Sequence, residues 1–286
     1  MELLKPTNDY VFKRIFGQNK NSDLLKDLLQ AILPNWNIQS VKPKQEVQLE
    51  TDFITDKICR LDILATLNDG TNVDIEMQMA NCNDTEARAL FYTTREYHHS
   101  LQTGEQYIEI PKSIGIWISK FNVFKDDGPF HEIVRLKRDY ENTIFTDKME
   151  IHFLQLPKFK KKCKRISNKL EEWLTFISFE NVEELKMIEN EKIKKAEEEL
   201  EYLSGDEAER RIAWLRETAE LDRKFAMTAA RDQGKAEGLA EGLAEGRAKG
   251  RAESMKIVAK KLLAKNMDID SIIELTGLTK EEIEKL

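Results

Sequence analysis

The stretch 60–79 constrains the fold more than any other part of the sequence, because it predicts two strands joined by a tight turn. Asn68-Asp69-Gly70 is a strong hairpin signal, and the length of this loop decides which residues face one another. A two-residue loop would set Asp62 opposite Met77. A three-residue loop, with its glycine in the left-handed conformation, would set Asp62 opposite Glu76 on one face of the sheet. We predict the three-residue loop.

Polar side chains alternate along the second of these strands, where Asp74, Glu76 and Gln78 occupy every other position and share one face. Asp62 and Glu76, paired roughly 5 Å apart, repel one another unless a cation bridges them or one of them is protonated. A divalent metal is therefore one prediction, and an exposed polar face of an antiparallel sheet is the alternative. We expect Asp74 to be solvated or to face a helix N-terminus.

The composition is that of a charge-rich globular protein with enough apolar material for a core: 286 residues, 41% hydrophobic and 34% charged. The net charge of −7 argues against a wholly basic nucleic-acid coat but allows a local basic groove. No apolar run or signal region predicts membrane insertion or export. The three scattered cysteines, Cys59, Cys82 and Cys163, suit a reducing cytoplasm.

Apolar periodicity and turn signals predict an ordered series of elements before residue 160. Thr7 or Asn8 caps a first helix that ends at Gly17. After it we predict a helix at 22–32, a strand at 41–50, the hairpin, a helix at 84–101, and strands at 113–121, 133–136 and 150–156. This order predicts an α/β fold with a mixed central sheet flanked by helices.

The rest of the chain predicts an all-α C-terminal extension. A charged helical stretch covers 182–225, with a break near Ser204-Gly205. Over 234–253, glycine and alanine each recur every four residues. Because a helical glycine costs about 1 kcal/mol relative to alanine, a flexible linker is one interpretation. The Ala, Glu, Leu, Arg and Lys residues between the glycines favour the other, a helix used for self-association. Short helical pieces over 256–286 look like a helix-turn-helix tail, with an acidic last helix.

The hairpin carries a resemblance to a known family. Asp62 on one strand and Ile75-Glu76-Met77-Gln78 on the next resemble the PD-(D/E)XK nuclease pattern in its D…ExQ form. The segments that match one branch of this superfamily are 8–17 and 60–63, together with Arg88 and Tyr92 on the following helix. Over about the first 160 residues, the chain resembles Rpn-type recombination-promoting nucleases, which are transposase-like proteins. The resemblance implies a PD-(D/E)XK, restriction-endonuclease-like core.

The resemblance also implies a metal site in the hairpin. Asp62 and Glu76 would be the carboxylate ligands of Mg²⁺ (or Mn²⁺), with the backbone carbonyl of Met77 as a third ligand. Gln78 would be the third catalytic residue. It stands where the parent pattern has a lysine, and its amide can orient a water but carries no charge. Which group acts as the general base stays open.

Accessory residues are expected from two helices and a basic run. Asp9 is a candidate third carboxylate, with stabilisation of the helix dipole as an equal alternative. Lys13 follows one turn later and is expected to contact phosphate. Arg88 and Tyr92 would face phosphate, or else serve packing and salt bridges. The basic run 158–165 is either solvated or grips the DNA backbone through Lys160, Lys161 and Lys162.

We expect four segments: a PD-(D/E)XK nuclease-like domain at 1–165, a charged helical region at 166–233, the Gly-Ala repeat at 234–253 and a small tail at 254–286. The first functional hypothesis is a Mg²⁺-dependent DNA endonuclease of the cytoplasm, linked by resemblance to recombination, mobile elements or phage defence in a bacterium. The second is a catalytically silent nuclease-fold protein that binds DNA or forms homo-oligomers through its C-terminal helices. The intact Asp62, Glu76 and Gln78 favour the first hypothesis, and the acidic net charge mildly favours the second.

Overall fold

The structure is a computed structural model that describes residues 2–44, 48–49, 59–60, 62–81, 84–101 and 104–286. Parts of the predicted strand at 41–50 and of the 60–63 segment lie outside these residues, as does Cys82. The chain divides into two compact units, Met1–Lys224 and Phe225–Leu286. Each unit is described by itself below.

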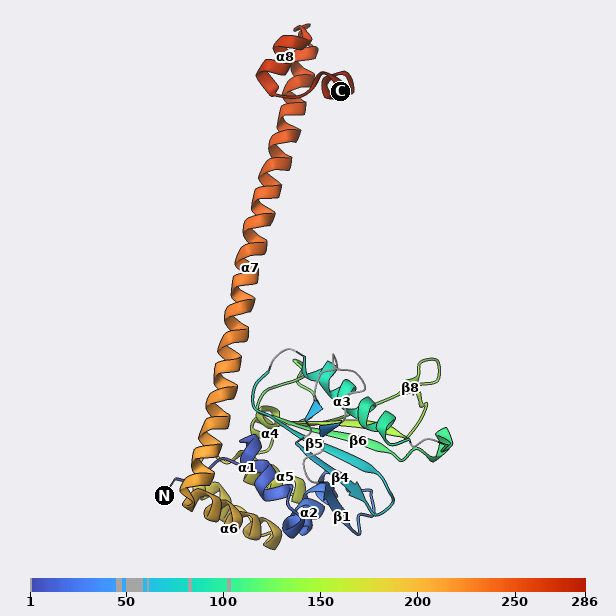
Figure 1. The fold of residues 1–286 in the computed structure, drawn as a ribbon, viewed down its shortest axis with the longest axis vertical. Helices are drawn as coiled ribbons and strands as arrows, with labels where there is room; N and C mark the ends of the chain where they lie inside the picture. Colours follow the sequence, from blue (N-terminus) through green and yellow to red (C-terminus); the bar gives the residue numbers. More distant parts are fainter. Residues whose placement is uncertain (1, 45–47, 50–58, 61, 82–83, 102–103) are drawn as a thin grey trace. The chain divides into compact units, whose positions relative to one another are not determined.

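The first unit is built on a mixed six-stranded sheet of order β1-β4-β5-β6-β10-β7 (Figure 1). The strands are β1 Val41–Lys44, β4 Ile63–Leu67, β5 Asn72–Gln78, β6 Ser113–Ser119, β7 His131–Arg135 and β10 Met149–Gln155. The three central strands β5, β6 and β10 run parallel, and the other pairs are antiparallel. Two-stranded ribbons are formed by β2 Gln48–Leu49 with β3 Cys59–Arg60, and by β8 Lys137–Arg138 with β9 Thr143–Ile144. The predicted α/β fold is confirmed.

The hairpin between β4 and β5 has the predicted three-residue loop. Ile63 pairs with Ile75 and Thr66 with Asn72, a register that continues to Asp62 opposite Glu76. The Leu67 N–H donates to the Thr71 carbonyl at 2.9 Å, which closes the loop. Gly70 has φ +86°, a left-handed conformation that glycine adopts without steric cost.

The two faces of the sheet are covered by different helices. Helices α1 Asp9–Phe16 and α2 Ser22–Ile32 pack their apolar sides on one face, which carries Val73, Ile75 and Met77 of β5. Helix α3 Thr85–His99 covers the other face, where Ala89 packs with Trp117 (Figure 1). Alternation along β5 therefore turns Asp74, Glu76 and Gln78 toward α3.

Further helices complete the first unit. They are α4 Leu156–Lys162, α5 Lys169–Ser178, α6 Glu191–Gly205 and the first turns of α7 Glu207–Leu263, with short 3₁₀ segments at Asn19–Asn21, Tyr107–Glu109 and Val182–Met187. The break predicted near residue 204 is confirmed. Helix α4 was not predicted, and it starts because a proline in its first turn presets a helical φ. The apolar core includes Trp173 of α5 and Leu200 of α6. The unit thus extends past residue 165, while the end of the nuclease-like domain stays a prediction.

The second unit consists of the rest of α7 and two short helices. The Gly-Ala repeat at 234–253 is helical throughout, as the residues between its glycines favour, and α7 continues without a break to Leu263. A separate helix beginning near 256 was therefore a wrong prediction. Helices α8 Ile269–Thr276 and α9 Lys280–Glu284 pack on the end of α7 through a small cluster of Ala259, Ile272, Leu278 and Ile283. Across the part of the chain that the structure describes, no helix combines the length and apolarity needed to span a bilayer.

Candidate active site

Asp62 and the end of β5 are tied together by reciprocal hydrogen bonds. The Asp62 N–H donates to Glu76 Oε1 at 3.0 Å, and the Met77 N–H donates to Asp62 Oδ2 at 2.9 Å. Because the N–H and C=O groups of a strand residue point to the same neighbouring strand, the Met77 carbonyl faces the Asp62 side as well. The register of the hairpin thus brings two carboxylates and one backbone carbonyl to one end of the sheet.

Gln78 extends this arrangement to helix α3. Its Nε2 donates to Glu76 Oε2 at 3.1 Å, and its Oε1 accepts from Arg88 Nη1 at 3.2 Å. These two bonds fix which way the amide points. The Arg88 guanidinium in turn lies 3.5 Å from the Tyr92 hydroxyl and over the rings of Tyr92 and Trp117. In this structure Arg88 contacts both Gln78 and Tyr92, and a phosphate-facing role for Arg88 and Tyr92 stays a prediction.

Helix α1 contributes one cation and one carboxylate. Asn8 caps the helix by accepting from the Tyr10 and Val11 N–H groups. One turn into the helix, Lys13 Nζ lies 3.1 Å from Asp62 Oδ1. Asp9 Oδ1 accepts from the Tyr10 N–H at 2.7 Å, and Asp9 Oδ2 lies 4.0 Å from the Arg216 guanidinium.

Asp74 departs from its prediction, because it is neither solvated nor paired with a helix N-terminus. Its side chain is only 1% exposed, and neither carboxylate oxygen has a hydrogen-bond partner. The cause is helix α3, which covers this face of β5 and brings the buried Glu96 into its electrostatic surroundings. A strand pattern of alternating acids does not reveal what covers the strand.

Burial governs the electrostatics of these acids. Desolvation raises the pKa of Glu76 well above its usual range, and the Asp62 and Asp74 carboxylates raise it further. Desolvation likewise raises the pKa of Asp74, with repulsion from Asp62 and Glu96 added. Burial also raises the pKa of Asp62, although Lys13 and the Met77 N–H oppose the shift. Ionising all three acids is therefore costly without added positive charge.

A cavity of about 330 Å³ opens over the carboxylates. It is lined by the predicted Asp9, Asp62, Glu76, Met77, Gln78 and Arg88, and by Met79, Arg216, Ala219 and Glu220. The last three belong to the first turns of α7, which lie within the same unit. Sequence analysis missed them, because α7 has the charge pattern of an ordinary solvated helix and no motif marks this face.

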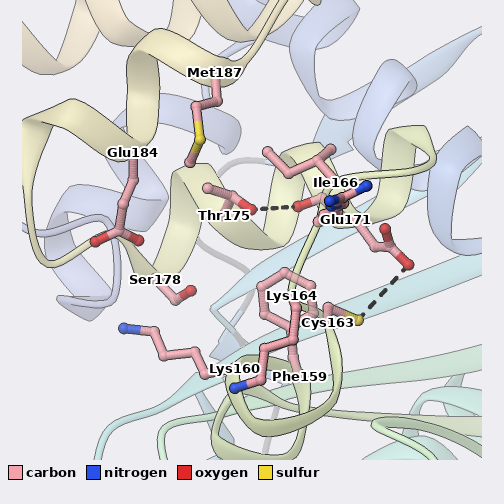
Figure 2. A pocket seen from close by; sticks show the side chains of 11 residues that line it. Phe159, Lys160, Cys163, Lys164, Ile166, Glu171, Thr175, Ser178, Glu184 and Met187 are labelled. Atoms are coloured by element: carbon pink, nitrogen blue, oxygen red, sulfur yellow. Dashed lines mark hydrogen bonds between the residues drawn. The ribbon is translucent and has the colours of Figure 1, made fainter.

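The three lysines proposed to grip DNA lie elsewhere. None of Lys160, Lys161 and Lys162 lines the cavity over Asp62. Lys160 lines a separate pocket of about 420 Å³ (Figure 2) and pairs with Glu180, while Lys161 pairs with Asp127 at 3.0 Å. The structure thus gives these lysines carboxylate partners outside the candidate site.

The donor set fits a hard divalent cation. Among the described residues, no three His, Cys, Asp or Glu side chains are arranged to hold a metal. Asp62 and Glu76 with the Met77 carbonyl offer two carboxylates and a neutral oxygen, which suits Mg²⁺ because this ion keeps several waters and often binds through one or two carboxylates. Lys13 supplies a positive charge at Asp62 in the structure.

The helix-flanked mixed sheet and the carboxylates at the end of β4 and β5 define an α/β protein of the PD-(D/E)XK nuclease type. The chain belongs to the family described as PD-(D/E)XK nuclease family transposase, whose family model matches residues 6–230. This match covers the hairpin, α3 and the first turns of α7. Comparison with curated proteins and with solved structures gives no match.

The orphaned carboxyl of Asp74 leads to a stability prediction. The ionised form is disfavoured in the folded protein, so wild-type stability falls as the pH rises from the ordinary carboxyl pKa to the raised one. Asp74→Asn removes this penalty. We expect the variant to be more stable than wild type near neutral pH by about 1–3 kcal/mol, with a smaller gain near pH ~4. Thermal unfolding across this pH range measures the difference.

Asp139→Asn is the matched control, because Asp139 is exposed on the surface of the same unit. Equal effects of the two substitutions, or a gain for Asp74→Asn that shrinks as the pH rises, would contradict the role assigned to buried Asp74.

Proposed function

We propose that the protein is a metal-dependent DNA endonuclease that hydrolyses phosphodiester bonds with Mg²⁺ or Mn²⁺ held by Asp62, Glu76 and the Met77 carbonyl. The observation that carries the proposal is the paired register of Asp62 and Glu76 in the lining of a cavity, with a 3.0 Å bond from the Asp62 N–H to Glu76 and a 2.9 Å bond from the Met77 N–H to Asp62. Membership in the nuclease family supports the same reaction class.

The roles of the side chains follow from their contacts. Mg²⁺, when bound, supplies positive charge to the scissile phosphate and activates the attacking water. Gln78, whose amide is fixed between Glu76 and Arg88, is placed to orient that water through a hydrogen bond. The positive charge of Arg88 lies beside the site, because its guanidinium is hydrogen-bonded to Gln78. Lys13 balances the charge of Asp62 and is the nearest cation from α1.

The biological setting proposed for this activity is DNA recombination, the movement of mobile elements or phage defence in a bacterial cytoplasm. The proposal draws on the family description, which combines nuclease and transposase. We expect cleavage with little sequence preference.

Plasmid nicking tests the enzymatic proposal. Wild-type protein with Mg²⁺ should convert supercoiled plasmid to nicked and linear forms, and EDTA should stop the reaction. Glu76→Gln keeps the shape of the side chain but removes its charge, so we expect nicking to fall by at least ~100-fold, as for loss of a group that stabilises a transition state. Gel densitometry over time gives the rates.

Glu183→Gln serves as a control, because Glu183 is exposed on a 3₁₀ segment and does not line the cavity over the carboxylates. Equal nicking by wild type and Glu76→Gln would contradict catalysis at this site. Absence of nicking by both would favour the catalytically silent, DNA-binding or oligomerising protein.

We also propose that the repeat at 234–253 associates with a second copy of the chain. Its five glycines lie on an exposed helix, with open space where each Cβ would be. These glycines cost helix stability of about 1 kcal/mol each, and close approach of another backbone would offset that cost. The glycine row is flanked on one side by a mostly acidic row and on the other by Lys235, Leu239, Leu243, Arg247 and Arg251. Two parallel copies would set these unlike rows against each other.

Replacing Gly238, Gly242 and Gly246 with glutamine tests this association. The longer side chains favour helix over glycine but fill the groove. We expect helical circular dichroism to rise while the mass in light scattering falls from a multiple of 33.3 kDa to the monomer value. A wild-type monomer, or an oligomer that survives the triple substitution, would contradict the proposal.

A further inference from the structure

A second hollow adjoins the catalytic cavity. It measures about 660 Å³ and shares Asp9, Asp62 and Arg216 with that cavity. The two hollows therefore meet at one place, where α1, α7 and the start of β4 come together. We call the second one the basic hollow, because the cationic side chains among its other lining residues are Lys13, Arg14, Lys20 and Lys44.

The charge changes sign across the shared residues. On the catalytic side the wall carries Glu76 and Glu220 in addition to the shared acids. On the other side the basic hollow has no acidic lining residue beyond Asp9 and Asp62 among the residues that the structure describes there. A polyanion that meets a metal at Asp62 and Glu76 would find more cationic and fewer acidic side chains in the basic hollow than in the catalytic cavity. The charge distribution thus favours one path for a polyanion, from the carboxylates into the basic hollow.

Arg216 stands at the junction of the two hollows. Its side chain is 57% exposed, and its ion pair with Asp9 is long, at 4.0 Å. A planar guanidinium binds phosphate oxygens through two parallel hydrogen bonds. An exposed arginine with a long, partly solvated ion pair can exchange that pair for a phosphate at little cost.

Two sets of contacts with α1 and its cap anchor the turns of α7 that precede Arg216. Asn8 Nδ2 donates to the Ala213 carbonyl at 2.9 Å in a buried contact. Glu209, about two turns before Arg216, accepts from Arg14 Nη2 at 2.6 Å and from the Tyr10 hydroxyl at 2.7 Å. The first turns of α7 are therefore anchored to α1, and the part of the helix that carries Arg216 is held near the carboxylates.

We propose that the DNA strand runs from the carboxylates into the basic hollow, and that Arg216 binds the backbone phosphate at the junction. The next phosphates lie along α1 toward Lys20, which lines the hollow, is 57% exposed and would exchange its 2.7 Å ion pair with Glu199 for a phosphate. This inference rests on the proposed function, since it takes DNA as the ligand. It assigns a phosphate-binding residue to a helix outside the sheet and its two covering layers.

Binding without cleavage isolates this role. The full chain is titrated into a short fluorescein-labelled DNA duplex in EDTA, and anisotropy is recorded at several KCl concentrations. For Arg216→Ala we expect binding weaker by on the order of tenfold, and a slope of log K against log salt reduced by about one, as for loss of one phosphate contact. Lys20→Ala should act in the same direction with a smaller effect, and Arg216→Lys should keep the slope.

Arg211→Ala is the matched control, because Arg211 is an exposed arginine on the same helix and lines neither hollow. Thermal unfolding verifies that each variant is folded. Equal affinity and equal salt slope for Arg216→Ala and Arg211→Ala would overturn the inference, as would a wild-type chain that does not bind in EDTA. If wild type nicks plasmid while Arg216→Ala matches Arg211→Ala throughout, only the inference fails. If wild type binds through Arg216 but does not nick, only the enzymatic proposal fails.

Discussion

The reciprocal hydrogen bonds between Asp62 and the end of β5 hold the site together. Each bond uses a backbone N–H of one strand and a carboxylate of the other, so the pair forms only in the register that a three-residue loop sets. A shift by one residue would turn Glu76 to the opposite face, away from α3. Gly70 at φ +86° makes this loop possible. One turn residue thus determines whether the two carboxylates meet.

The site balances its acidic side chains against cations from two helices, α1 and α3. Asp74 and Glu76 are buried and Asp62 is partly exposed beside them, and desolvation raises the pKa of each. Lys13 from α1 contacts Asp62, and Arg88 from α3 reaches the acids through Gln78. The charge that a motif lysine would bring on β5 is instead spread over neighbouring helices. The position of the motif lysine on β5 is therefore occupied by Gln78, whose amide makes two hydrogen bonds.

Local signals predicted the parts of the structure that local physics controls. The loop at 68–70, the cap at Asn8 and the stop at Gly17 each depend on residues close in sequence, and the structure agrees with all three. Long-range packing escaped prediction. Asp74 was expected to be solvated or to face a helix N-terminus but is buried under α3, and Arg216 lines the cavity although more than a hundred residues separate it from the hairpin. The residues around Asp74 and around Arg216 carry no local pattern that predicts which distant element packs against them. The roles assigned to the site residues stay predictions.

The central claim is that Asp62, Glu76 and the Met77 carbonyl form a divalent-metal site. The most direct measurement is a crystal structure of the full chain grown with Mn²⁺, with anomalous scattering recorded at the manganese edge. The account predicts one strong peak within coordination distance of all three groups, with Lys13 moved away from Asp62 Oδ1. Carboxylates that keep their present hydrogen bonds with no peak between them, or manganese bound only elsewhere on the chain, would contradict it.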